Sequence, residues 1–166
     1  MKKRFLLLTL EFLAITVPLG WLWIEWGRTF YLKVFVELAT PIFILIGVTE
    51  LKAQLVIDHF INYVPFFVLM VITPTLTIKR RAIGTVVGFV IIFLGHILLA
   101  SVAFIASSKY GESQEAFNTL FPAFLFNDSL PFILWAIISA GYLKTVVTGV
   151  ADSGQRARLR SRGREK

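Results

Sequence analysis

The feature that most constrains this chain is the stretch 62–106, in which two apolar segments flank the basic triplet Lys-Arg-Arg at 79–81. Segment 82–106 contains no charged residue, and segment 62–77 is also free of charge. A helix needs about 20 apolar residues to cross a bilayer core, and cationic loops stay on the cytoplasmic side. The stretch therefore predicts two membrane spans joined by a cytoplasmic turn.

The composition agrees with a membrane location. Hydrophobic residues make up 57% of the 166 residues, whereas a soluble domain has about 45–50% apolar residues. The net charge of +7 comes mostly from three clusters, at 2–4, 79–81 and 156–166, which border apolar segments. Such clusters are typical of membrane topology rather than of nucleic-acid binding. The chain has no cysteine, which excludes disulfides, thiolate metal sites and a cysteine nucleophile.

The three basic clusters also predict the number of spans. The apolar run 5–24 is too long for a signal peptide and lacks a small-x-small cleavage site, so we expect a retained first span. With further spans at 62–77, 82–106 and 131–150, four crossings place all three clusters in the cytoplasm, whereas five would separate them. Residues 29–60 are therefore expected not to cross, but to form a hairpin or interfacial helices on the outer face, covered by protein.

The expected fold class is all-α, an integral membrane helical bundle of about four spans with this non-crossing outer segment. Residues 1–152 form the transmembrane domain and 153–166 a basic cytoplasmic tail. The expected location is the cytoplasmic (inner) membrane, with both termini in the cytoplasm. Residues 107–128 are expected to lie in the outer interface, and the polar run 127–129 to cap a last helix that begins at Pro131.

Ionisable residues inside spans call for partners, because each costs about 2.5–3.5 kcal/mol on insertion scales. Glu11 and Lys144 lie at similar depths from the cytoplasmic face, which predicts an intramembrane pair between the first and last spans. The alternative is that both side chains extend to the headgroups. Toward the outer face the polar residues Asp58, Asn62 and Asp128 are expected to form a cluster.

Two histidines are candidate cofactor ligands. His96 lies about 15 Å below the outer end of its span at helical rise, near the middle of the membrane, and His59 lies in the outer segment. A lone intramembrane histidine usually bonds a neighbouring helix. Imidazole is also a good axial ligand for haem or a chlorophyll-type pigment, so a cofactor role for His96, with or without His59, stays open beside the expectation of no cofactor.

Residues 78–84 (Ile-Lys-Arg-Arg-Ala-Ile-Gly) and the continuation 88–99 (Gly-Phe-Val-Ile-Ile-Phe-Leu-Gly-His-Ile-Leu-Leu) resemble the core of the exosortase/archaeosortase family. The similarity extends more loosely upstream and covers the middle half of the chain. Members are multi-span membrane proteins that process and sort carboxy-terminal signals on exported proteins, alongside exopolysaccharide or surface-layer systems. The resemblance implies a related helical membrane fold.

The residues that carry that family's chemistry are missing here. The family has a cysteine nucleophile just before the span that ends in the arginine turn, corresponding to 59–62, and an Asn-x-x-Arg pattern in the next span, corresponding to 96–99. This chain has no cysteine, and His96 and Leu99 replace the second pattern. A transpeptidase needs an activated nucleophile and a group that holds the oxyanion, so the resemblance implies a relative that is not an enzyme.

The sequence therefore favours a non-catalytic accessory or assembly protein of the inner membrane, tied to an exosortase-type protein sorting or exopolysaccharide system. Its expected partners are the lipid bilayer and other membrane proteins, and not nucleic acid. An accessory subunit of a respiratory or photosynthetic complex, with His96 or His59 contacting haem or pigment, is the main alternative. A small transporter is a third possibility that would require oligomerisation.

Overall fold

The computed structural model describes residues 2–48, 56–74, 76–111 and 113–144, and within these ranges it is helical without any strand. The all-α class is therefore confirmed for the described part of the chain. The tail 153–166 lies outside it, as do residues 145–150 of the last predicted span. The elements in chain order are α1 (Lys2–Leu22), the π-helical turn η1 (Trp23–Gly27), α2 (Arg28–Leu45), the 3-10 helix η3 (Ile57–Asn62), α3 (Tyr63–Ile72), α4 (Ile78–Tyr110) and α5 (Gln114–Ile138).

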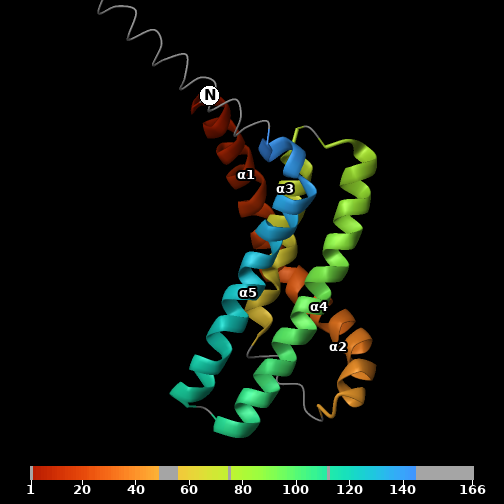
Figure 1. Ribbon diagram of the computed structural model, residues 1–166, viewed down its shortest axis with the longest axis vertical. Helices are drawn as coiled ribbons and strands as arrows, with labels where there is room; N and C mark the ends of the chain where they lie inside the picture. Colours follow the sequence, from red (N-terminus) through yellow and green to blue (C-terminus); the bar gives the residue numbers. More distant parts are fainter. Residues whose placement is uncertain (1, 49–55, 75, 112, 145–166) are drawn as a thin grey trace, which may run out of the picture.

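The long helices α4 and α5 run antiparallel and form the largest helix–helix contact, while α3 packs against α1, α4 and α5 (Figure 1). The amino terminus of α1, the turn between α3 and α4, and the carboxyl end of α5 lie at the same end of the molecule. The turn between α4 and α5 lies at the opposite end. The clusters 2–4 and 79–81 thus share one end of the molecule.

Within the described residues, α4 and α5 are the two helices long and apolar enough to cross a membrane, and residues 57–72 form a shorter apolar helical stretch. These two helices are consistent with a helical membrane protein. They correspond to the predicted spans 82–106 and, with shifted bounds, 131–150. The count of four crossings is not established by these helices and stays a prediction.

The boundaries of α5 differ from the prediction. Residues 114–128, expected as an interfacial segment, belong to a single helix with the last span, and its cap is Ser113, whose Oγ accepts from the amide of Ala116 at 3.3 Å. Pro131 was expected in the first turn, yet it lies inside the helix. The helix tolerates it because another chain segment satisfies a carbonyl that a proline leaves free: the side-chain amide of Asn62 donates to the carbonyl of Asn127, four residues before Pro131, at 2.8 Å.

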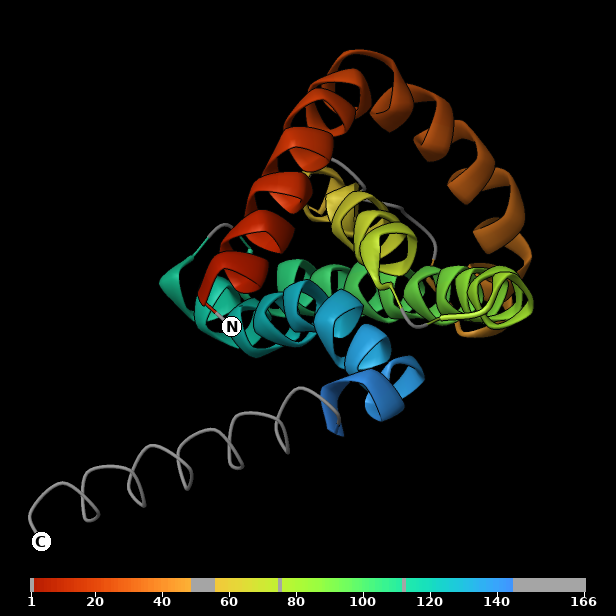
Figure 2. The ribbon, with the colours of Figure 1, turned by 90° about the horizontal axis from the view of Figure 1, so that it is seen from above.

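The first predicted span, 5–24, corresponds to α1, which ends at Leu22. Beyond it the chain stays helical to Leu45 through the π-helical turn η1. Seen from above, the path turns where α1 passes into α2 (Figure 2). Trp23 lies on Gly27 within this turn, and a Cβ at Gly27 would come within 2.9 Å of the indole ring. A π-helical turn often marks a functional position, and this one places Trp23 and Tyr31 on the same inner face.

Three glycines of α4 permit the close packing of its neighbours. A Cβ at Gly88 would lie 2.0 Å from Cζ of Phe66 in α3, and one at Gly84 would lie 2.8 Å from Cε of Met70. Gly95 faces Leu130 of α5 at 2.9 Å. Small residues allow such approaches in membrane helices, so the glycine stripe of α4 fixes where α3 and α5 pack.

Candidate functional site: a buried histidine–tyrosine chain and an adjoining pocket

His96 lies at the centre of the molecule, on the inner face of α4. Its side chain is fully buried, and its ring stacks on Phe60 of η3 with ring centroids 4.4 Å apart. Tyr31 of α2 and Tyr63 of α3 meet the same imidazole edge-on, at 5.6 Å and 5.3 Å. Four helical elements therefore each contribute one aromatic or imidazole ring to this cluster.

A chain of hydrogen bonds runs through the cluster. His96 Nδ1 lies 2.8 Å from the hydroxyl of Tyr31, which lies 3.2 Å from the hydroxyl of Tyr63. Tyr63 in turn donates to the backbone carbonyl of Phe89 at 3.3 Å. Buried polar groups are costly without such partners, and here the partners come from α2, α3 and α4, so the chain ties these three helices together.

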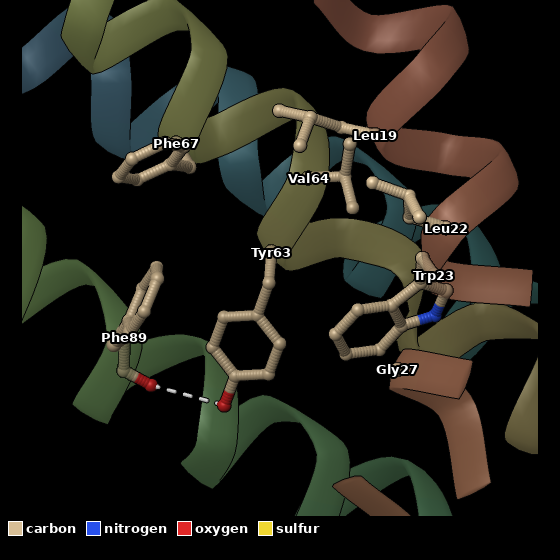
Figure 3. Close-up of a pocket in the computed structure, with 8 residues that line it drawn as sticks. All are labelled: Leu19, Leu22, Trp23, Gly27, Tyr63, Val64, Phe67 and Phe89. Carbon is tan, nitrogen blue, oxygen red and sulfur yellow. Dashed lines mark hydrogen bonds between the residues drawn. The ribbon is translucent and has the colours of Figure 1, made fainter. Parts of the chain in front are cut away.

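A pocket of about 280 Å³ adjoins the chain and opens at the side of the molecule, between α1, α3 and α4. Tyr63 belongs to both: its ring faces the pocket, and its hydroxyl points toward the Phe89 carbonyl (Figure 3). The other walls are apolar or aromatic. The full lining is Leu19, Leu22, Trp23, Gly27, Tyr63, Val64, Phe67 and Phe89. Such a lining suits a hydrocarbon chain or an apolar side chain and offers no charged group to a polar substrate.

The predicted outer polar residues lie around η3. Asp58 forms an ion pair with Arg28 at 2.9 Å, and Asp128 of α5 pairs with His59 Nδ1 at 3.2 Å. Asn62 donates to the carbonyl of Asn127, whose own side-chain amide donates to the carbonyl of His59 at 3.2 Å. These bonds join η3 to α2 on one side and to α5 on the other.

The two candidate ligand histidines have different surroundings. His59 is half-buried, stacks on Phe124 at 4.1 Å and has its Nδ1 on Asp128. The ring of His96 is covered by Phe60 and bonded to Tyr31. Stacked rings cover a face of each imidazole, so a large planar cofactor between them would have to displace these contacts. Within the described residues, no group of three or more His, Cys, Asp or Glu side chains has the arrangement of a metal site.

The described residues do not test the predicted pair of Glu11 and Lys144; the ion pairs that they do show join Arg28 to Asp58 and His59 to Asp128. Glu11 is exposed on α1. The pairing stays a prediction, and a double-mutant cycle with Glu11→Gln and Lys144→Met tests it: a pair requires that the second change cost less after the first, and purely additive losses contradict it.

Sequence reasoning did not single out the partners of His96. Tyr31 and Tyr63 are 65 and 33 residues away in sequence, and only the folded chain brings their hydroxyls together. Two polar contacts at the end of α3 were also missed. Trp135 Nε1 donates to Thr73 Oγ1 at 2.8 Å, and Arg81 Nη2 donates to the Thr73 carbonyl at 2.6 Å. A signal was present, because buried tyrosine and tryptophan usually find a hydrogen-bond partner.

Family models, curated proteins and solved structures were compared with the chain, and none of them matches it. What the protein does is therefore argued from its own residues. Those residues form a buried aromatic and polar centre, an apolar lateral pocket and an outer surface rich in large apolar side chains.

Proposed function

We propose that this chain is a non-catalytic protein of the cytoplasmic membrane of a bacterium or archaeon, and that it acts as an accessory or assembly partner of other membrane proteins. The observation that carries the proposal is the exposed apolar surface of α4 and α5. On α4 it forms a stripe, called here the α4 outer stripe: Ile83, Val87, Val90, Leu94, Leu98 and Ile105. A surface of this kind needs lipid or another protein against it.

The interior supports a structural rather than a catalytic role. The hydroxyls of Tyr31 and Tyr63 are engaged with His96, with each other and with a backbone carbonyl. Ser101, the hydroxyl nearest in sequence to His96 on α4, donates to the carbonyl of Ile97 at 2.8 Å. Nucleophilic catalysis requires an activated hydroxyl or thiol that a substrate can reach. The Tyr31 hydroxyl beside His96 instead joins α2 to α4, and Ser101 bonds within its own helix.

The topology that goes with this proposal is four crossings with both termini in the cytoplasm. The shared end of clusters 2–4 and 79–81 supports it, because positive residues accumulate on the cytoplasmic side. In this arrangement α4 and α5 cross fully, α3 with η3 forms a shorter crossing, and the α4–α5 turn faces outward.

The partner that the sequence resemblance favours is a protein-sorting or exopolysaccharide system of the exosortase type. This finer proposal is supported by residues 78–84 and 88–99 alone. A chain that keeps that helical core without its cysteine and arginine would contribute contacts rather than chemistry to such a system.

A site-specific cross-linking experiment in native membranes tests the proposal. A photo-activatable residue replaces Val90 or Leu94 of the α4 outer stripe, or Val17 on the exposed side of α1 as the control face. We expect one protein adduct of defined mass from the α4 outer stripe and lipid adducts from Val17. Lipid adducts alone from every position would contradict a partner role, and the mass of the adduct identifies whether the partner is a sorting enzyme.

The alternative, a cofactor-contacting subunit of a respiratory or photosynthetic complex, makes a different prediction. It requires His96 or His59 to give up its stacking contact with Phe60 or Phe124. The visible absorption spectrum of the protein purified in mild detergent distinguishes the two: a stoichiometric haem or pigment band, lost in His96→Ala or His59→Ala, would favour the cofactor subunit.

A further inference from the structure

Two buried polar atoms near the centre of the molecule have no hydrogen-bond partner among the residues that the structure describes. They are Nε2 of His96 and Oδ1 of Asn127, and their side chains are 0% and 1% exposed. The other polar atoms of the same two side chains are bonded, His96 Nδ1 to Tyr31 and Asn127 Nδ2 to the His59 carbonyl. Leaving a buried polar atom unsatisfied costs about 1–3 kcal/mol, so both atoms call for a partner.

The hydrogen-bond chain determines which kind of partner His96 requires. A carbonyl can only accept, so Tyr63 donates its proton to Phe89. The oxygen of Tyr63 then accepts from Tyr31, and the oxygen of Tyr31 accepts from His96. The proton of the neutral imidazole therefore lies on Nδ1, and Nε2 is a bare acceptor. Since Oδ1 of an amide is also an acceptor, the two atoms cannot satisfy each other directly.

Both side chains contact η3, His96 from α4 through Phe60 and Asn127 from α5 through the His59 carbonyl. Oδ1 of Asn127 is 3.6 Å from the position that a Cβ on Gly95 would take, and Gly95 immediately precedes His96. Nδ2 of Asn127 bonds the carbonyl of His59, and the next residue, Phe60, stacks on the His96 ring. Two independent contacts thus bring the Asn127 amide to the surroundings of the imidazole.

We propose that His96 Nε2 and Asn127 Oδ1 form a buried site for one water molecule, which donates a hydrogen bond to each and joins α4 to α5. Water is the smallest neutral molecule with two donor hydrogens, and buried waters in proteins characteristically bond polar groups that are otherwise unsatisfied. A metal ion fits less well, because one imidazole nitrogen and one amide oxygen make an incomplete ligand set.

Nitrogen NMR of the protein with ¹⁵N-labelled histidine, in detergent micelles or nanodiscs, tests this site. The chain has two histidines, so the His59→Gln variant assigns the signals. We expect His96 to be neutral with its proton on Nδ1, and its Nε2 to show an unprotonated, hydrogen-bonded shift with magnetisation transfer from water. A protonated Nε2, or an unprotonated Nε2 without transfer from water, would overturn the proposal.

A tyrosine variant supplies a second, independent outcome. Tyr63→Phe removes the group that accepts from Tyr31, so Tyr31 becomes free to donate to His96 Nδ1, and the imidazole proton moves to Nε2. The expected result is a change of tautomer, whereas Tyr110→Phe at the end of α4 leaves the tautomer unchanged. An unchanged tautomer in Tyr63→Phe contradicts the directional chain. A spectrum altered by a metal chelator would also overturn the proposal, because a water molecule is not removed by chelation.

Discussion

The side chain of Asn62 compensates for a proline on another helix. Pro131 has no amide hydrogen to donate to the carbonyl of Asn127, and Asn62 supplies the donor from η3 at 2.8 Å. Asn127 returns a bond to the carbonyl of His59. This reciprocal pair of asparagine bonds holds α5 against η3 at the point where the backbone bonding of α5 is interrupted.

Replacing Asn62 by Leu should lower the thermal midpoint in detergent, because the Asn127 carbonyl is left buried without a donor, at a cost of about 1–3 kcal/mol. Pro131→Ala restores a backbone amide that can bond the same carbonyl. The loss caused by Asn62→Leu should therefore be smaller in the Pro131→Ala background. Equal losses in both backgrounds would show that Asn62 does not compensate for the proline.

Tyr31→Phe should also be destabilising, since it deprives both His96 Nδ1 and the Tyr63 hydroxyl of a buried partner. The expected loss is about 1–3 kcal/mol, measured by thermal or denaturant unfolding in detergent. Tyr110→Phe removes the same hydroxyl from a half-buried position and serves as the matched control. If both variants lose the same stability, the hydrogen-bond chain contributes nothing.

The polar residues that the sequence singled out were recognisable because ionisable and amide groups stand out in apolar segments. The partners of these residues could not be recognised from the sequence. Asp128 was expected with Asp58 and Asn62, and it contacts His59, while Asp58 pairs with Arg28. Tyr31 and Phe60 went unnoticed because aromatic residues are ordinary in an apolar segment, and their roles depend on a contact between residues 65 and 36 positions from His96.

At the scale of the elements, the glycines of α4 decide how closely α3 approaches. Gly88→Ala places a methyl group 2.0 Å from Cζ of Phe66, and overpacking of this kind costs about 1–3 kcal/mol. The thermal midpoint in detergent should fall accordingly. Gly20→Ala in α1 is the control, because nothing lies within 4 Å of its added Cβ; there alanine should be neutral or stabilising. Partial recovery of Gly88→Ala by Phe66→Leu would confirm that Phe66 is the contact.

The two apolar segments and the basic turn between them predicted the helices α3 and α4. A charge-free run that is bounded by cations has few structures open to it other than a helix in a membrane. The prediction was wrong at α5 because Asn-Asp-Ser before a proline is also a common helix start. The helix continues there because Asn62 satisfies a carbonyl from outside. The end of the first span was close to that of α1, but the sequence did not show that the chain continues as a π-helical turn, in which Trp23 packs on Gly27.

At the scale of the whole molecule, the exterior carries many large apolar side chains around a core that is itself mostly apolar and holds a few polar groups. Buried residues include His96, Asn62 and Asn127, while large apolar side chains of α1, α4 and α5 are exposed. Lipid and partner proteins are the surroundings in which this distribution is stable. We therefore expect α4 to cross a membrane, from the basic turn at 79–81 to the turn before α5.

Single-cysteine labelling tests this claim most directly, because the natural chain has no cysteine. Ile78→Cys, at a position 86% exposed beside the basic turn, and Gln114→Cys, exposed at the start of α5, are treated in intact cells with a membrane-impermeant maleimide. We expect Gln114→Cys to react in intact cells and Ile78→Cys to react only after permeabilisation. Reaction of both cysteines from the same side would contradict it.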